Sequence, residues 1–239
     1  MFRSTMNRLL LAGVEAAASV ARPILNRVEL RRAKNIQLER ERRALASTVD
    51  YVQRHMRDAA PVSSKFDLLT KAFTKANLDG DRLICEFGVF TGSTINHLAK
   101  MTSKTIFGFD SFEGLPEAWG HRVQKGHFAV KKLPPVRSNV TLVKGWFNET
   151  LPPFLRENPG KIAFLHVDCD LYSSTATILE LLEPRFVPGT VIAFDEFFNY
   201  PGWEDGEFRA FNEFIARTSL SFEFIGYHCK GEQAALVLK

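Results

Sequence analysis

Two short apolar segments of this chain each end in acidic residues, and this pattern narrows the folds that the chain can adopt. The segment IAFLHV is followed by Asp-Cys-Asp at positions 168–170, and the segment GTVIAF is followed by Asp-Glu at positions 195–196. Short apolar runs of this kind are typical of buried strands in parallel sheets. Ligands of open α/β sheets bind at the carboxyl edge, where the two acidic clusters would meet. The pattern therefore favours a carboxylate-rich site at this edge over the alternative that these acids are solvated loop residues or helix caps.

Strand-like and helix-like segments alternate from about residue 80 to the C-terminus, which predicts a mostly parallel sheet with helices on both faces. The last two strand-like segments are joined by the short sequence HCKGE and are expected to form an antiparallel hairpin. The predicted fold is α/β and Rossmann-like, with seven strands in RLICEFGVF, KTIFGFD, NVTLVKG, KIAFLHVDCD, GTVIAFDEF, SFEFIGY and QAALVLK.

The positive charge of the chain is concentrated in its first 45 residues. These hold nine Arg and one Lys against four Glu, or +6, and the whole chain carries +4, so the remaining 194 residues sum to about −2. We accordingly divide the chain into a basic helical arm over residues 1–45, a helical cap or lid over residues 46–79, and a main domain over residues 80–239. A slightly acidic main domain argues against a nucleic-acid partner.

The N-terminal arm admits more than one interpretation. Its start, MFRSTMNR followed by LLLAGVEAAASVA, resembles a weak signal or transit peptide, although Glu15 interrupts the apolar stretch. The interpretation we favour is an amphipathic helix that ends near Pro23, followed by a charged helix in which Glu39 and Arg43 have i,i+4 spacing. Such an arm would serve packing, homo-oligomerisation or peripheral contact with an anionic membrane surface. A cleaved targeting segment and a disordered arm are the alternatives.

Two features of the sequence bear on location. No segment approaches the roughly 18–20 apolar residues of a membrane-spanning helix. The three cysteines, Cys85, Cys169 and Cys229, form neither a disulfide framework nor a CxxC zinc motif. A reducing, cytoplasmic location is therefore expected.

A glycine-containing turn follows the first strand of the main domain. The sequence from Glu86 to Ser93 places Gly88 and Gly92 where the backbone can approach a ligand closely, and the next helix offers free N–H groups to a carboxylate or phosphate. The spacing is GxxxG rather than GxGxxG, so it does not indicate dinucleotide binding. Taken alone the motif is weak, because many strand–turn–helix units need a glycine.

An acid ends the second strand of the main domain. Asp110 comes about 20 residues after the glycine turn, where a carboxylate is placed to accept hydrogen bonds from ribose hydroxyls. A helix N-cap at Asp110-Ser111 is the alternative, and the preceding glycine turn makes it less favoured. Trp146 follows the third strand, where its ring would either flank an adenine or pack in the core. These residues suggest a nucleoside-binding end of the site.

Five blocks of the sequence together resemble one known family. EFGVFTGSTINHLAK, FDSFEGLP, GWFNETLP, HVDCDLYSST and FDEF are similar to the macrocin O-methyltransferase (TylF-like) group of class I S-adenosyl-L-methionine-dependent methyltransferases, over about residues 80–239. The resemblance implies the class I methyltransferase fold and S-adenosyl-L-methionine as the cofactor. Glu86, Gly88 and Ser93 would lie along the methionine end of the cofactor and Asp110 on its ribose. The full set of expected cofactor-binding residues is Glu86, Gly88, Gly92, Ser93, Asp110, Ser111 and Trp146.

The same resemblance implies a divalent metal, Mg²⁺ or Mn²⁺, held by Asp168, Asp195 and Glu196. It puts Asp170 at the position of the catalytic general base. The residues agree with this independently of the family, because hard cations prefer oxygen ligands. Since side chains alternate along a strand, Asp168 and Asp170 can share a face, and Cys169 is expected to point away and be packed.

A metal that holds two adjacent substrate oxygens would lower the pKa of a hydroxyl group, and Asp170 would take the released proton. His166 is either a partner of a metal ligand or, as we favour, a buried histidine with its own hydrogen bonds. Tyr172, Tyr200 and Trp203 either form walls of an acceptor site or cover the core of their own loop.

The expected function is a metal-dependent O-methyltransferase that acts on a hydroxyl of a small molecule such as a sugar or polyol. The alternative is a non-catalytic S-adenosylmethionine-binding scaffold that acts through its basic arm. It is less favoured because unselected buried carboxylates around an empty metal site would repel each other. A metal-dependent hydrolase would use the acids equally well but leaves Gly88, Gly92 and Asp110 unexplained. The sequence does not identify the acceptor.

Overall fold

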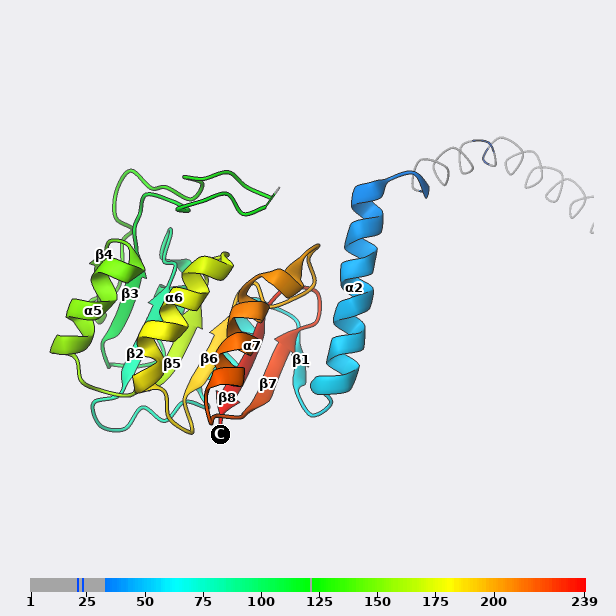
Figure 1. Cartoon of the computed structure of the whole chain (residues 1–239). Helices are drawn as coiled ribbons and strands as arrows, with labels where there is room; N and C mark the ends of the chain where they lie inside the picture. The colour runs from blue at the N-terminus through cyan, green and yellow to red at the C-terminus, as the bar shows by residue number, and fades with distance from the viewer. Residues whose placement is uncertain (1–20, 22, 24–32, 121) are drawn as a thin grey trace, which may run out of the picture.

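An eight-stranded sheet forms the centre of the computed structural model, which describes residues 21, 23, 33–120 and 122–239 (Figure 1). The strand order is β1-β7-β8-β6-β5-β2-β3-β4. Strand β8 runs antiparallel to β6 and β7, and the other neighbouring strands are parallel. This confirms the predicted mostly parallel α/β sheet with a C-terminal hairpin. The strands are β1 (Ala60–Val62), β2 (Leu83–Phe87), β3 (Ile106–Asp110), β4 (Val140–Lys144), β5 (Ile162–Val167), β6 (Val191–Phe194), β7 (Phe222–His228) and β8 (Ala234–Leu238).

The predicted number of seven strands is corrected to eight by β1, which lies in the segment expected to be a helical cap. This strand has three residues and pairs in parallel with β7, where Ala60 lies opposite Gly226. Its central residue, Pro61, lacks an N–H group, and proline is tolerated on edge strands. A three-residue strand is too short for an alternating pattern to reveal it in the sequence.

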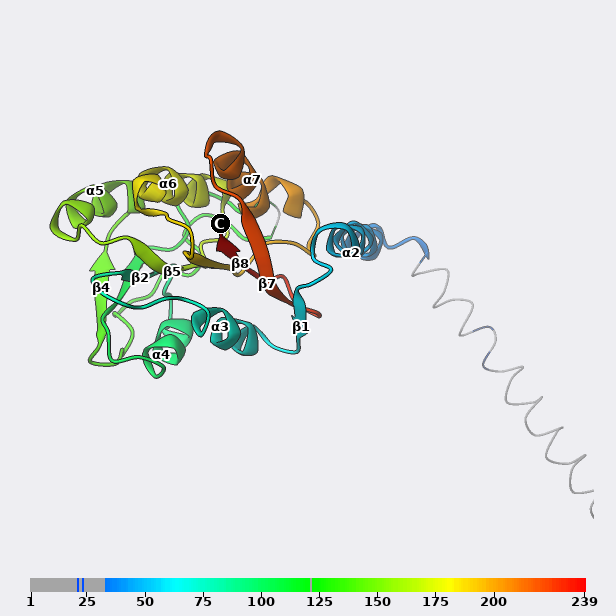
Figure 2. The same ribbon diagram turned by 90° about the horizontal axis from the view of Figure 1, so that it is seen from below.

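Helices cover both faces of the sheet (Figure 2). All six residues of the central strand β5 are buried, as expected for a parallel strand covered on both sides. One face carries α3 (Lys65–Phe73) and α4 (Ser93–Ala99), and the other carries α5 (Phe147–Glu157), α6 (Tyr172–Leu182) and α7 (Glu207–Arg217). Short 3₁₀ turns at Glu183–Arg185 and Trp203–Asp205 complete the described elements together with α2 (Ile36–His55).

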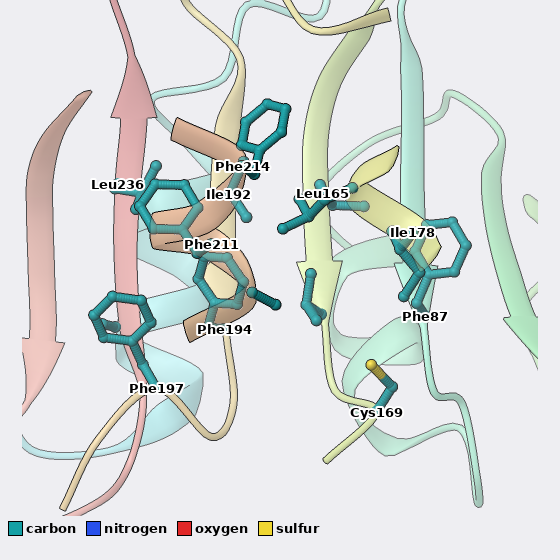
Figure 3. Packing of buried hydrophobic residues seen from close by; sticks show 14 of the residues in the cluster. Phe87, Leu165, Cys169, Ile178, Ile192, Phe194, Phe197, Phe211, Phe214 and Leu236 are labelled. Atoms are coloured by element: carbon teal, nitrogen blue, oxygen red, sulfur yellow. The ribbon is translucent and has the colours of Figure 1, made fainter. Parts of the chain in front are cut away.

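The hydrophobic core has one layer on each face of the sheet. Along β5, Phe164 packs against Phe73 of α3, whereas Leu165 belongs to the layer under α5, α6 and α7. Figure 3 shows this second layer, in which Leu165 lies opposite Ile192 of β6 and shares one cluster with Phe211 of α7. Burial on both faces specifies the strand register, because a slip of one residue would exchange the two layers.

Helix α2 lies beside the β1 and β7 edge of the sheet in both views (Figures 1 and 2). Its N-cap, Asn35, accepts a hydrogen bond from the N–H of Leu38 at 3.1 Å. Thr48 accepts a hydrogen bond from the N–H of Asn199 at 2.9 Å, and the ring of Tyr51 packs against Phe224 of β7. The C-terminal half of α2 is therefore docked on the main domain.

The expected boundary between arm and cap, at residues 45 and 46, falls inside α2, which runs through it without interruption. Within this helix Arg43 Nε lies 3.0 Å from Glu39 Oε1, which confirms the predicted i,i+4 pair. The predicted amphipathic helix that ends near Pro23 lies almost wholly outside the described residues. Among the residues that are described, no helix is both long and apolar enough to cross a membrane.

A close contact between the turn after β2 and the end of β5 shapes the carboxyl edge of the sheet. Gly88 has φ +94°, and a Cβ atom at this position would lie 1.6 Å from the carbonyl oxygen of Asp168. The N–H of Gly88 donates to the carbonyl of Phe109 on β3 at 2.9 Å. Only glycine satisfies both the positive φ and the close approach of Asp168.

Replacing Gly88 by alanine is expected to lower the free energy of unfolding by at least about 3 kcal/mol, because strain at a positive φ is combined with a backbone clash. Gly189→Ala is the matched control, since Gly189 has φ +92° but no atom within 4 Å of the added Cβ. The control should lose only about 1–2 kcal/mol. Denaturant unfolding measures the free energy of unfolding of both variants. Equal losses of stability would show that the close contact with Asp168 is not the reason that position 88 requires glycine.

Candidate active site

A cavity of about 630 Å³ opens at the carboxyl edge of β2, β3, β5 and β6. The strand order reverses between β2 and β5, which is where open α/β sheets bind ligands. Of the predicted site residues, Glu86 and Gly92 do not line this cavity. Those that line it are Gly88, Ser93, Asp110, Ser111, Trp146, Asp168, Asp170, Asp195 and Glu196.

Asp110 joins the turns that follow β2 and β3. Its Oδ2 accepts hydrogen bonds from the N–H groups of Val89 and Phe90, both at 2.8 Å, and its Oδ1 accepts from the N–H of Phe112 at 2.7 Å. Phe90 and Phe112 both have positive φ, at 47° and 60°. Asp110 therefore stabilises two turns that contain residues with positive φ, and it also lines the cavity. It is not a helix N-cap, because a long loop and then β4 follow β3.

Ser111 and Trp146 lie at the same end of the cavity. The hydroxyl of Ser111 accepts a hydrogen bond from the N–H of Glu113 at 3.1 Å, which holds it beside Asp110. Trp146 directly precedes α5 and is half-buried, so it lines the cavity rather than filling the core. The part of Trp146 that lines the cavity is available for contact with a ligand.

Glu86 is fully buried, and its carboxylate forms hydrogen bonds with two other side chains. Its Oε1 accepts a hydrogen bond from the hydroxyl of Thr94 at 2.9 Å, and its Oε2 lies 2.9 Å from Nδ1 of His166. Both carboxylate oxygens are thus used inside the protein. His166 is 1% exposed, and its contact with Glu86 confirms the expectation of a buried histidine with a hydrogen bond of its own.

The acidic clusters after β5 and β6 meet in the cavity. His166, Asp168 and Asp195 each offer a ligand atom within 4.8 Å of the others. Asp195 Oδ2 accepts a hydrogen bond from Nζ of Lys65 at 3.3 Å, whereas its Oδ1 is buried and has no hydrogen-bond partner among the described residues. Sequence reasoning did not identify Lys65, because nothing local marks a lysine about 130 positions away as the partner of Asp195.

Burial and repulsion by neighbouring carboxylates raise the pKa values of Asp168 and Asp170. Asp168 keeps part of its surface open to the cavity, yet burial by its surroundings, followed by the charge of Asp195, raises its pKa well above the usual range. Burial, with the charge of Asp195 in the same direction, raises the pKa of Asp170 to about 7. For His166, burial lowers the pKa, but Glu86 and the other carboxylates outweigh this and the net pKa is raised.

The donor set fits a divalent cation. Clustered buried carboxylates with raised pKa values lack enough positive charge nearby, and the unpartnered Oδ1 of Asp195 faces this cluster. Hard cations such as Mg²⁺ and Mn²⁺ take carboxylate oxygens as ligands. Glu196 lines the same cavity, but its carboxylate is not part of the compact group formed by His166, Asp168 and Asp195.

A further buried acid, Glu207, was missed from the sequence. It begins α7, is fully buried, and accepts a hydrogen bond from the N–H of Glu196 at 3.2 Å. Burial, and then the charge of Asp170, raise its pKa. The Sγ atom of Cys169 lies 3.9 Å from Glu207 and 3.3 Å from the hydroxyl of Thr175, which confirms that this cysteine is buried and packed, although part of the residue still borders the cavity. The only signal for Glu207 in the sequence is that it is an acid at the start of an amphipathic helix. Such an acid normally indicates stabilisation of the helix rather than a site residue.

The aromatic residues considered as acceptor walls lie outside the cavity lining. Tyr200 and Trp203 are buried, and Trp203 packs against Phe208 with ring centroids 4.6 Å apart. Tyr172 donates a hydrogen bond to Glu213 at 2.5 Å on the outer side of α6 and α7. For Tyr200 and Trp203 the structure agrees with the interpretation in which these side chains cover the core of their own loop. Tyr172 fits neither interpretation, because it lies at the surface between α6 and α7.

Known proteins match this chain over its central part. Residues 85–197 match the methyltransferase domain family. An 8-demethyl-8-(2,3-dimethoxy-alpha-L-rhamnosyl)-tetracenomycin-C 4′-O-methyltransferase of Streptomyces olivaceus is 35% identical over 115 residues, covering 40% of this chain and 43% of that protein. A demethyldecarbamoylnovobiocin O-methyltransferase of Streptomyces niveus is 28% identical over 178 residues, covering 62% of this chain and 63% of that protein. The matches thus span less than two thirds of either relative.

Solved structures agree in fold. A calicheamicin methyltransferase is 29% identical and superposes with a TM-score of 0.60, covering 72% of this chain and 78% of that chain. The O-methyltransferase NovP is 20% identical with a TM-score of 0.53, covering 72% of this chain and 76% of that chain, and this likeness concerns the fold alone. The chain therefore has the class I methyltransferase fold that its sequence predicted.

Proposed function

We propose that this protein is a divalent-cation-dependent O-methyltransferase that transfers a methyl group from S-adenosyl-L-methionine to a hydroxyl of a small natural-product-like acceptor. The observation that carries the proposal is a single cavity with two chemically different ends. One end has the glycine turn, Asp110 and Trp146, and the other has Asp168 and Asp195. Methyl transfer needs a nucleoside site and an acceptor site that are continuous.

The cofactor would bind at the glycine turn. A carboxylate has about four acceptor positions, and three backbone N–H groups bind Asp110, so one position remains for a ribose hydroxyl. Ser111 would lie beside this ribose, and the indole of Trp146 would flank the adenine. Gly88 and Ser93 line the part of the cavity assigned to the methionine end. Glu86 and Gly92 would act indirectly, by holding the turn.

The acceptor would bind beside the carboxylates. Asp168 and Asp195, with Glu196 in the set expected from the sequence, would hold Mg²⁺ or Mn²⁺. A divalent cation bound there would supply a Lewis acid that lowers the pKa of the acceptor hydroxyl. Asp170 lines the same cavity and is the proposed base that takes the proton from this hydroxyl. Lys65 would keep Asp195 in place from the α3 side.

A deoxysugar hydroxyl is the acceptor class that we propose. One similar protein is named as acting on a rhamnosyl tetracenomycin, and one similar structure is described as a TDP-rhamnose 3′-O-methyltransferase with 27% identity and a TM-score of 0.51. The sequence blocks that resemble the macrocin O-methyltransferase group support the same class. We propose a cytoplasmic location and no nucleic-acid partner, with the basic arm serving oligomerisation or peripheral membrane contact.

The second candidate function is a non-catalytic S-adenosylmethionine-binding scaffold. It would use the same cofactor end of the cavity and act through the N-terminal arm. The buried acids around Asp195 argue against it, because such a cluster costs stability and a scaffold gains nothing from it. Cofactor binding without turnover on any sugar acceptor would favour the scaffold.

Asp110→Asn is expected to weaken binding of S-adenosylhomocysteine by about 10–100-fold, since a hydrogen bond to a charged group contributes about 1.5–3 kcal/mol. Asp79→Asn, at an exposed position, is the control for loss of one negative charge. Calorimetric titration measures both affinities. An Asp110→Asn protein that is folded and binds as tightly as the control would refute the ribose assignment.

Removal of divalent cations is expected to stop methyl transfer. The assay follows formation of S-adenosylhomocysteine with TDP-rhamnose and a panel of rhamnosides as acceptors, first in EDTA and then with Mg²⁺ or Mn²⁺ restored. Asp195→Asn should raise the metal concentration needed for half-maximal rate, because it removes a charged oxygen ligand. Undiminished transfer in EDTA would rule out the metal role.

Asp170→Asn should lower turnover by about 10²–10⁴-fold, the range for a lost general base, while cofactor and metal affinities stay near those of the wild type. Turnover is measured with the same assay at saturating metal. The contrast with Asp195→Asn is informative, since that variant should respond to added metal and Asp170→Asn should not. Near-normal turnover of Asp170→Asn would remove this residue from the mechanism.

A further inference from the structure

His166 occupies a position in the sheet that points its side chain toward the acidic clusters. It is the next-to-last residue of β5, opposite Glu86 on β2 and Ala193 on β6. Since strand side chains alternate, His166 shares a face of the sheet with Asp168, two residues later. The neighbour on the other side, Ala193, has only a methyl group, so a bulky side chain does not separate His166 from Asp195.

The ring of His166 is held in one orientation. Its Nδ1 lies 2.9 Å from Oε2 of Glu86, and the hydroxyl of Thr94 fixes the other oxygen of that carboxylate at 2.9 Å. Both His166 and Glu86 are within 1% of full burial. With Nδ1 fixed by a carboxylate, Nε2 is directed to the opposite side. A histidine held by a carboxylate through one nitrogen is the arrangement that orients histidine ligands in metal sites.

The group that Nε2 faces is the unpartnered oxygen of Asp195. Nε2 and Oδ1 are 4.0 Å apart, which is too long for a hydrogen bond. Oδ2 of the same carboxylate is bound to Lys65, so the side chain is fixed while Oδ1 stays buried without a partner among the described residues. Nitrogen and oxygen ligands lie about 2.0–2.2 Å from a first-row divalent cation, so two atoms about 4 Å apart can both bind one ion.

Resting on the divalent-cation dependence proposed above, we propose that Nε2 of His166 is a ligand of that cation, together with Asp168 and Asp195, and that Glu86 orients the ring. A mixed nitrogen and oxygen set suits Mn²⁺ and related transition metals better than Mg²⁺, which prefers oxygen ligands alone. The site would therefore bind Mn²⁺ more tightly than Mg²⁺. This assigns a function to the buried Glu86–His166 pair, which neither lines the cavity nor takes part in methyl transfer directly.

The test is pulsed electron paramagnetic resonance on the full-length protein with one equivalent of Mn²⁺. Directly bound imidazole should give ¹⁴N modulation in the wild-type spectrum, and this signal should change to the ¹⁵N pattern when the protein is made with ¹⁵N-histidine. His166→Gln should lose the nitrogen signal. Glu86→Gln should keep it but bind Mn²⁺ about 10–100-fold more weakly, the usual effect of removing the group that orients a ligand. His97→Asn, a control on α4, should change neither the signal nor the affinity.

The outcomes separate this inference from the proposed function. Mn²⁺ that binds to the wild type without nitrogen coupling overturns the role of His166 and leaves the carboxylate metal site intact. Failure of the wild type to bind Mn²⁺ overturns both the role of His166 and the metal dependence. If His166→Gln does not fold, the spectra of the unlabelled and ¹⁵N-histidine wild-type protein still show whether a histidine nitrogen is bound to Mn²⁺. Methyl transfer activity is not the readout, so an unidentified acceptor does not affect the result.

Discussion

The interaction on which the site depends is repulsion among carboxylates that the fold buries at one edge of the sheet. Asp168, Asp170 and Asp195 meet there because β5 and β6 are adjacent and both end at the cavity. Buried like charges raise one another's pKa values and cost stability unless positive charge or protons compensate. Lys65 and the imidazole of His166 supply part of this compensation. A cation held by His166, as proposed above, would take the place of the proton on the imidazole, so metal binding and protonation would compete at one position.

The cofactor end of the cavity is held in a different way, by backbone geometry. The turn after β2 must pass so close to Asp168 that only glycine fits at position 88, and Asp110 ties this turn to the one after β3. The same contact places the cofactor end and the carboxylate end side by side. A change in the turn is thus transmitted directly to Asp168. Under the proposed function, binding of the cofactor and binding of the metal would therefore both be sensitive to the backbone conformation at Gly88.

The sequence predicted the parts of the structure that rest on local patterns. Apolar runs ending in acids identified β5 and β6, and the motif blocks identified most of the cavity residues. It did not reveal β1, because three residues carry no periodic signal. Lys65 and Glu207 were also missed, since their roles depend on contacts with Asp195 and Glu196 that form only in the folded chain. His166 was correctly expected to be buried. That its ring faces Asp195 could not be predicted, because this depends on the register of β2, β5 and β6, which the sequence does not give.

Segments that are distant in sequence meet behind Asp170, outside the cavity lining. Arg122, in the long loop between β3 and β4, donates two hydrogen bonds at 3.0 Å to Glu232 in the β7–β8 turn. Its guanidinium also stacks on Trp119 and Tyr200, and its charge lowers the pKa of Asp170 against the raising effects of burial and Asp195. The turns around Asp110 follow consecutive strands, whereas the surroundings of Asp170 depend on three separate loops. Under the proposed function, substitutions in those loops would change the surroundings of the proposed base without disturbing the turn assigned to the nucleoside. Such a division would let one fold keep a common methyl donor while its acceptors differ.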